Sequence, residues 1–133
     1  MTSNSFKRAG MAAFALALLS SAAAFAQSKV ENATVAFLMP DQASTRYEEH
    51  DYPGFKAEME KLCPTCTVLY QNADADASRQ QQQFNSVIAQ GAKVIVLDPV
   101  DSAAAAGLVE IAHSQGVKVV AYDRPIPDKP ADF

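Results

Sequence analysis

Polar side chains with hydrogen-bonding chemistry follow each of four short apolar runs in this 133-residue sequence. Asp41 comes after the first run, Asn72 after the second and Asp98 after the third, while Asp123 and Arg124 end the fourth. Carboxylates and amides form paired hydrogen bonds at fixed spacing, and an arginine presents a fork of donors. That combination matches the neighbouring hydroxyl groups of a sugar, so these residues predict a site for a polyhydroxylated ligand.

Asp123 and Arg124 are the strongest candidates for ligand contact. An ion pair between sequence neighbours in an extended segment has poor geometry, because the two side chains face opposite ways. Arg46 and Tyr47 lie in the long segment after the first run. They either bind ligand or belong to an ordinary loop that packs onto the first helix.

The other strand-end residues have structural interpretations beside the functional one. Asp101 stands at an expected helix start, where an N-cap is the favoured role. Asp98 precedes a proline and either shapes a turn or binds ligand, and both interpretations stay open. Asp41 and Asn72 are residue types common in loops, so loop geometry alone also explains them.

The sequence gives less support to phosphate binding, nucleophilic catalysis or metal binding. A glycine-rich phosphate-binding motif does not follow the first run, and neither His50 nor His113 stands at a strand end beside a Ser or Cys. One C-x-x-C motif with two scattered histidines makes no zinc ligand set. We therefore expect no metal and no cofactor. An exported α/β enzyme acting on carbohydrate through two aspartates remains the alternative function.

A parallel sheet would bring the strand-end residues together. The four runs, at 33–39, 67–70, 93–97 and 118–122, lack the polar alternation of strands with one solvated face. Helical patterns lie between them, from about Asp51 to Leu62, from 77 or 78 to Gln90 and from Ser102 to Gln115. This alternation predicts an α/β fold, a three-layer doubly wound parallel sheet in the order 2-1-3-4. Ligands of such sheets bind beyond the carboxyl ends of the strands.

The second helical pattern carries a run of four glutamines. Its apolar residues Phe84, Val87 and Ile88 recur at helical spacing and should be buried. We expect the run from Gln80 to Gln83 to form the solvated surface of this helix.

Cys63 and Cys66 are the two cysteines of the sequence. A catalytic C-x-x-C normally begins a helix, where the dipole stabilises the thiolate, whereas this pair follows one. We therefore expect a small disulfide that closes a turn between a helix and a strand.

The first 26 residues have the composition of a cleaved signal peptide. Lys7 and Arg8 precede an apolar run over 9–19, and Ala24-Phe25-Ala26 offers small residues at a cleavage site. The run is shorter than the roughly 20 residues of a spanning helix, so an uncleaved anchor is disfavoured. We expect residues 27–133 to form one domain, exported to the periplasm.

The charge balance bears on possible partners. With 11 basic and 15 acidic residues, the formal charge is -4 and the pI about 5.0. That is the wrong sign for a nucleic-acid surface, so we expect no nucleic-acid partner.

Three segments of the sequence carry a family resemblance: STRY (44–47), IVLDPVDS (95–102) and VVAYDR (119–124). In order and spacing they resemble the N-terminal lobe of periplasmic sugar-binding proteins of the ribose and xylose type. The resemblance implies sugar hydrogen bonds from Asp123, Arg124 and Arg46, and ring stacking by Tyr47. In close xylose-binding relatives that aromatic residue is usually Trp. Family members also tend to begin their first helix near this aromatic residue, earlier than Asp51.

The resemblance also implies a function and partners. The protein would be the solute-binding component of an ABC-type monosaccharide uptake system, and it would deliver its sugar to an inner-membrane permease or chemoreceptor. We expect a monomer. The effector domain of a sugar-responsive repressor shares this lobe, but there a helix-turn-helix takes the place of the signal peptide.

The sequence stops at Phe133, where the family continues into a further strand, a hinge and a second lobe. We therefore expect a truncated chain that binds sugar very weakly or not at all, because a single lobe without the second one leaves the ligand in contact with water. We also expect its edge strand to stay open to pairing.

Overall fold

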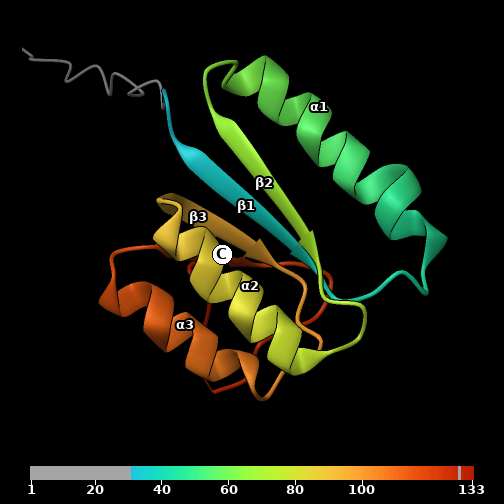
Figure 1. Ribbon diagram of the computed structural model, residues 1–133, viewed down its shortest axis with the longest axis vertical. Coiled ribbons are helices and arrows are strands. Elements are labelled where there is room, and N and C mark those ends of the chain that lie inside the picture. Colours follow the sequence, from blue (N-terminus) through green and yellow to red (C-terminus); the bar gives the residue numbers. More distant parts are fainter. Residues whose placement is uncertain (1–30, 129) are drawn as a thin grey trace, which may run out of the picture.

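A single four-stranded parallel sheet forms the centre of the molecule. The computed structural model describes residues 31–128 and 130–133, so the predicted signal peptide lies outside the described residues. The strands are β1 (Thr34–Met39), β2 (Thr67–Asn72), β3 (Ala92–Leu97) and β4 (Lys118–Ala121). All three pairings are parallel, and the order is β2-β1-β3-β4 (Figure 1). The predicted doubly wound sheet is therefore confirmed.

Helices connect the strands at close to the predicted places. They are η1 (Tyr47–Asp51), α1 (Tyr52–Leu62), α2 (Ala77–Ala89) and α3 (Ala105–Ser114). The first helical segment begins at Tyr47 rather than near Asp51, because a turn of π-helix precedes α1. Pro53 has no N–H to donate to that turn, which suits a change of helical geometry at this point.

The third helix begins later than the predicted Ser102. The Asp101 carboxylate accepts hydrogen bonds from the backbone N–H groups of Ala103 and Ala104, at 2.9 and 3.0 Å. These bonds stabilise a separate turn before α3 begins at Ala105. Asp101 thus performs the capping role that its position suggested, on a turn instead of on the helix.

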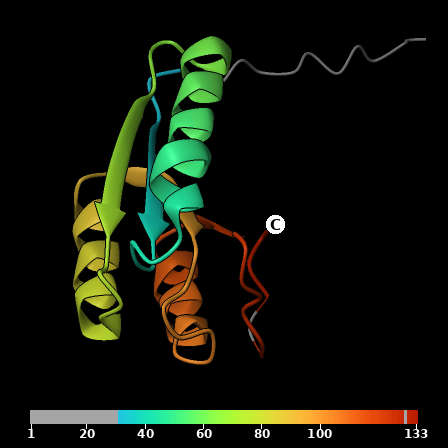
Figure 2. The same ribbon diagram turned by 90° about the vertical axis from the view of Figure 1, so that its right-hand side faces the viewer.

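The core lies on both faces of the sheet, as expected for strands without polar alternation. On one face Leu38, Ile95 and Leu97 pack with residues of α2 and α3. On the other, Phe37 and Val96 pack with the half-buried Phe55 of α1. Successive residues of each strand therefore serve opposite layers, and α1 lies across the sheet from α2 (Figure 2).

One face of the sheet has less helical cover than the other. A groove beside α1 is lined by residues of five elements of the fold, which are β1, η1, α1, β3 and β4, and its apolar members include Phe55, Val96 and Val120. Neighbouring strands lie about 4.8 Å apart and packed helices about 10 Å apart, so a four-stranded sheet accommodates two helices on each face. Among the described residues, helices α2 and α3 pack on one face, while α1 and the preceding turn η1 pack on the other.

The prediction of a fully solvated glutamine run is wrong at both ends of the run, since Gln83 is half-buried and its Nε2 donates to the Asn72 carbonyl at 2.8 Å. Gln80 is only 2% exposed, whereas Gln81 and Gln82 face solvent. Position 80 is four residues before Phe84 and seven before Val87, so it shares their buried stripe. Burial of a polar amide there is possible because the amide finds hydrogen-bond partners, which are described below.

The connections between elements include two features foreseen from the sequence. Cys63 and Cys66 form a disulfide between the end of α1 and the start of β2. Gly91 and Gly116, which follow α2 and α3, have positive φ angles of 88° and 70°. Glycine adopts this left-handed conformation without the steric cost that other residues pay.

The edge of β4 is not left unpaired, contrary to expectation. The backbone N–H of Asp132 donates to the Val119 carbonyl, and the Ala121 N–H donates to the Phe133 carbonyl, both at 2.8 Å. The Asp132 carboxylate also binds Lys118 at 2.6 Å and His113 at 2.9 Å. The last residues of the chain therefore lie against β4.

None of the helices in the described ranges is long and apolar enough to cross a bilayer.

Candidate functional site

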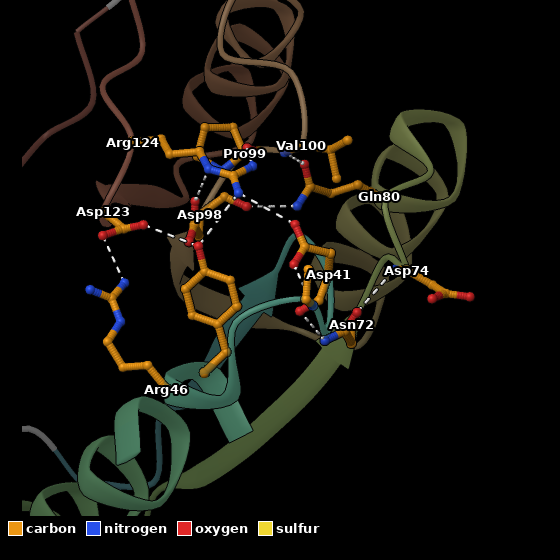
Figure 3. Close-up of polar contacts among 12 residues, drawn as sticks. Asp41, Arg46, Asn72, Asp74, Gln80, Asp98, Pro99, Val100, Asp123 and Arg124 are labelled. Atoms are coloured by element: carbon orange, nitrogen blue, oxygen red, sulfur yellow. Dashed lines mark hydrogen bonds and ion pairs between the residues drawn. The ribbon is translucent and has the colours of Figure 1, made fainter. Parts of the chain in front are cut away.

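The residues predicted at the strand ends meet at one edge of the sheet (Figure 3). We call Asp41, Arg46, Tyr47, Asp98, Asp123 and Arg124 the rim. They come from the segments after β1, β3 and β4, whose carboxyl ends lie side by side because the strands are parallel.

Asp123 joins the segment after β4 to the segment after β1. Its Oδ1 lies 2.7 Å from Nη2 of Arg46, and its Oδ2 accepts a hydrogen bond from the Tyr47 hydroxyl at 3.1 Å. The hydrogen bond from Arg46 is the main reason why the pKa of Asp123 lies below its usual value. The Arg46 and Asp123 side chains are 48% and 31% exposed, so both groups are accessible to a ligand.

Arg124 is held in place by several acceptors. Its Nη1 donates to the Pro99 carbonyl at 2.9 Å, and its Nη2 lies 3.4 Å from both Asp41 Oδ2 and the Tyr47 hydroxyl. The side chain nevertheless keeps 35% of its surface exposed. The guanidinium is therefore preorganised, with part of its surface free for a further contact.

Asp98 lies beneath Arg124 with none of its side chain exposed. Its Oδ1 is 3.5 Å from Nε of Arg124, and neither carboxylate oxygen has a hydrogen-bond partner among the described residues. Burial raises the pKa of Asp98 to about 6, against the lowering effect of the Arg124 charge. In this arrangement Asp98 contacts Arg124 from the interior of the protein and has no accessible side-chain surface for a ligand.

Asn72, predicted as a ligand group, uses its amide within the protein. Its Nδ2 donates to the Asp41 carbonyl at 2.9 Å and to Glu48 Oε1 at 3.1 Å. Its Oδ1 accepts from the Asp74 N–H at 2.9 Å. Asn72 therefore organises the loops after β1 and β2.

The two carboxylate oxygens of Asp41 have different partners. Oδ1 accepts a hydrogen bond from the Ala43 N–H within its own loop, while Oδ2 faces Arg124 in the rim.

The structure places Tyr47 differently from the expected stacking role. The side chain is 4% exposed and packs in the cluster with Phe37, Met39 and Val96. The Arg46 guanidinium lies 5.2 Å from the centre of the ring. Since the ring has so little accessible surface, its hydroxyl is the part that contributes to the rim.

Gln80 is the site residue that sequence reasoning missed. Its side chain bonds to the backbone of the turn 98–100, which carries Asp98. The helical spacing from Gln80 to Phe84 and Val87 was the available signal for its burial.

Within the described ranges, His, Cys, Asp and Glu form no group of three or more that could hold a metal ion.

Comparison with known proteins gives a consistent picture. A family described as periplasmic binding protein domain matches residues 35–133. The multiple sugar-binding periplasmic receptor ChvE of Rhizobium radiobacter is 31% identical over 103 residues, which are 77% of this chain and 27% of that protein. The D-xylose-binding periplasmic protein of Escherichia coli K12 is 35% identical over 66 residues, covering 50% of this chain and 20% of that protein.

A solved structure supports the same relationship. The carbohydrate transporter solute-binding protein from Chloroflexus aurantiacus, in complex with D-glucose, superposes with a TM-score of 0.62 at 28% identity. The match covers 73% of this chain and 27% of that one. The chain thus spans about a quarter of the length of these relatives.

Proposed function

The chain belongs to the periplasmic binding protein family, and on that premise we propose that its rim binds a monosaccharide without catalysis. The protein would serve as the solute-binding component of an ABC-type uptake system for a xylose- or ribose-like sugar in the periplasm, delivering it to a permease or chemoreceptor. Similarity to a multiple sugar-binding receptor and to a D-xylose-binding protein supports this assignment.

The observation that carries the proposal is the alternation of donors and acceptors around Asp123. Arg46 and Tyr47 donate to its carboxylate, and Arg124 lies 3.4 Å from the same tyrosine hydroxyl. A sugar presents neighbouring hydroxyl groups that both donate and accept. Such a ligand can insert into this network by replacing weak contacts with charge-assisted hydrogen bonds.

Nuclear magnetic resonance titration with D-xylose and D-glucose tests the proposal. We expect saturable amide shifts confined to rim residues, with millimolar affinity because the rim is open to water. Asp123→Asn should weaken binding about tenfold, since it removes a charged acceptor worth about 1.4 kcal/mol or more. Asn also tolerates the backbone conformation of Asp123, so the fold should be retained.

A matched control comes from Asp128, another aspartate with positive φ, which lies outside the rim. Asp128→Asn should leave the titration unchanged. Absence of saturable shifts at the rim, or equal binding by wild type and Asp123→Asn, would contradict the proposal. Release of the aryl group from aryl glycosides would contradict its non-catalytic part and favour the carbohydrate-active enzyme.

A further inference from the structure

Gln80 of α2 is a buried side chain whose amide is directed entirely at one turn. Its Nε2 donates to the Asp98 carbonyl and its Oε1 accepts from the Val100 N–H, each at 2.8 Å (Figure 3). With 2% of its surface exposed, the side chain has little access to solvent. Both polar ends of the amide are therefore used on residues 98–100.

Two further backbone groups of this turn are bound by other elements. The Asp98 N–H donates to the Leu38 carbonyl at 3.0 Å, which extends the pairing of β3 with β1. Pro99 has no N–H, and its carbonyl accepts from Arg124 Nη1 at 2.9 Å. Gln80 and Arg124 thus hold the same turn through different backbone groups.

This arrangement links a helix residue to the rim. The position of the Pro99 carbonyl determines where Arg124 is anchored, and the same turn carries the Asp98 carboxylate, 3.5 Å from Arg124 Nε. A buried amide with both ends paired fixes its partners firmly, because leaving the turn's N–H or carbonyl unpaired in the interior would cost free energy.

We propose that Gln80 is a positioning residue for sugar binding: by fixing the turn 98–100 it holds Arg124 and Asp98 in the geometry that the rim needs. This inference rests on the proposed function. Gln80 makes no contact with the ligand itself and acts through the backbone of the turn.

The test compares two substitutions of Gln80 with one of an exposed neighbour. Gln80→Leu removes both hydrogen bonds at similar side-chain size. Gln80→Glu keeps an acceptor for the Val100 N–H and loses the donor to the Asp98 carbonyl. Gln82→Leu, on the solvent side of the same helix, is the control.

Three quantities are measured on the whole chain: hydrogen exchange of the Val100 amide, the Nε–H resonance of Arg124, and D-xylose affinity. In Gln80→Leu we expect Val100 to exchange about tenfold faster and xylose to bind about tenfold more weakly, the effect of losing about 1.4 kcal/mol. The Arg124 resonance should move or broaden. Gln80→Glu should leave Val100 protected and still shift the Arg124 resonance, and Gln82→Leu should change none of the three.

A purely structural role for Gln80 makes a different prediction. It would lower thermal stability while the Arg124 resonance and the xylose affinity stayed as in wild type, and that result would overturn the proposal. If Gln80→Leu fails to fold, Gln80→Glu decides the matter by the same resonance. If wild type shows no xylose-dependent shifts, the proposed function fails, whereas the response of Arg124 still decides whether Gln80 positions it.

Discussion

Asp123 combines an unusual backbone conformation with a central place in the rim. Its φ angle is 58°, in the left-handed region that aspartate and asparagine enter more readily than most residues. This conformation separates the two neighbours, since Asp123 contacts Arg46 while Arg124 contacts the Pro99 carbonyl. Backbone outliers of this kind cluster at functional sites, where surrounding contacts maintain them.

The buried carboxyl group of Asp98 should make stability depend on pH. Its pKa is raised to about 6, so the folded state binds a proton more tightly than the unfolded state. The free energy of unfolding should therefore lose a contribution from Asp98 as pH rises from about 4 to about 6. Asp98→Asn should remove that loss and stabilise the protein at about pH 7, by about 3 kcal/mol at most.

Urea denaturation of wild type and Asp98→Asn at several pH values measures this effect. The difference between the two proteins is the relevant quantity, because Asp123 has a lowered pKa and contributes the opposite slope. Asp101→Asn at an exposed turn serves as the control. A destabilisation of Asp98→Asn that grows as pH rises would instead show that the charge of Asp98 stabilises the fold.

At the scale of elements, the helix ends explain how short connections lead the chain back to the sheet. Asp76 caps α2, because its Oδ1 accepts from the Arg79 N–H at 3.0 Å. At the other ends of α2 and α3 a left-handed glycine reverses the chain before the next strand. Local residue chemistry thus sets where α2 begins and where α2 and α3 end.

Two glycines of the α3 region should respond in opposite ways to alanine. Gly116 has a positive φ angle, so Gly116→Ala should lower the free energy of unfolding by about 1 kcal/mol. Gly107 lies within α3, and an added Cβ meets no atom within 4 Å. Gly107→Ala should therefore raise that free energy by up to about 1 kcal/mol. Urea denaturation distinguishes the two, and a stabilising Gly116→Ala would contradict the capping role.

The disulfide should add only modestly to stability. Cys63 and Cys66 are three residues apart, and the closing of so short a loop restricts the unfolded chain by about 2 kcal/mol at most. We expect the double substitution by alanine to fold and to unfold at slightly lower urea. Reducing agent should destabilise wild type by a similar amount and leave the double variant unaffected. A loss of fold on reduction would contradict this expectation.

At the scale of the whole molecule, the two faces of the sheet differ in their cover. Helices α2 and α3 pack on one face, whereas α1 leaves an apolar groove of about 640 Å³ on the other. Contiguous apolar surface of this kind is uncommon on isolated soluble domains.

The groove should bind a hydrophobic dye in the native state. Val120 of β4 lines it, so Val120→Lys should reduce the fluorescence of anilinonaphthalene sulfonate. Leu62, a single apolar residue that is 72% exposed at the end of α1, provides the control. Leu62→Lys should leave the signal unchanged. Equal fluorescence in wild type and Val120→Lys, with both folded by circular dichroism, would show that the dye binds elsewhere.

Much of the fold follows from the sequence alone. Uninterrupted apolar runs, helical spacing and the handedness of crossovers predicted the sheet order, and all four strands lie within two residues of their expected bounds. The resemblance suggested the early start of the first helical segment, which the apolar pattern near Asp51 did not reveal. Strand and helix positions depend mainly on residues that are close in sequence, so the order of apolar and polar residues along the chain predicts them.

Only the tertiary structure decided which polar residues remain available to a ligand. Asn72 and Asp98 both follow strands, yet the amide of one is used by adjoining loops and the carboxylate of the other is buried under Arg124. Gln80 was expected on the solvated face of its helix and Tyr47 in a loop or stacked on ligand, and both are almost fully buried. Burial and hydrogen-bond partners come from segments distant in the chain that pack together, and no local pattern records which segment will supply them.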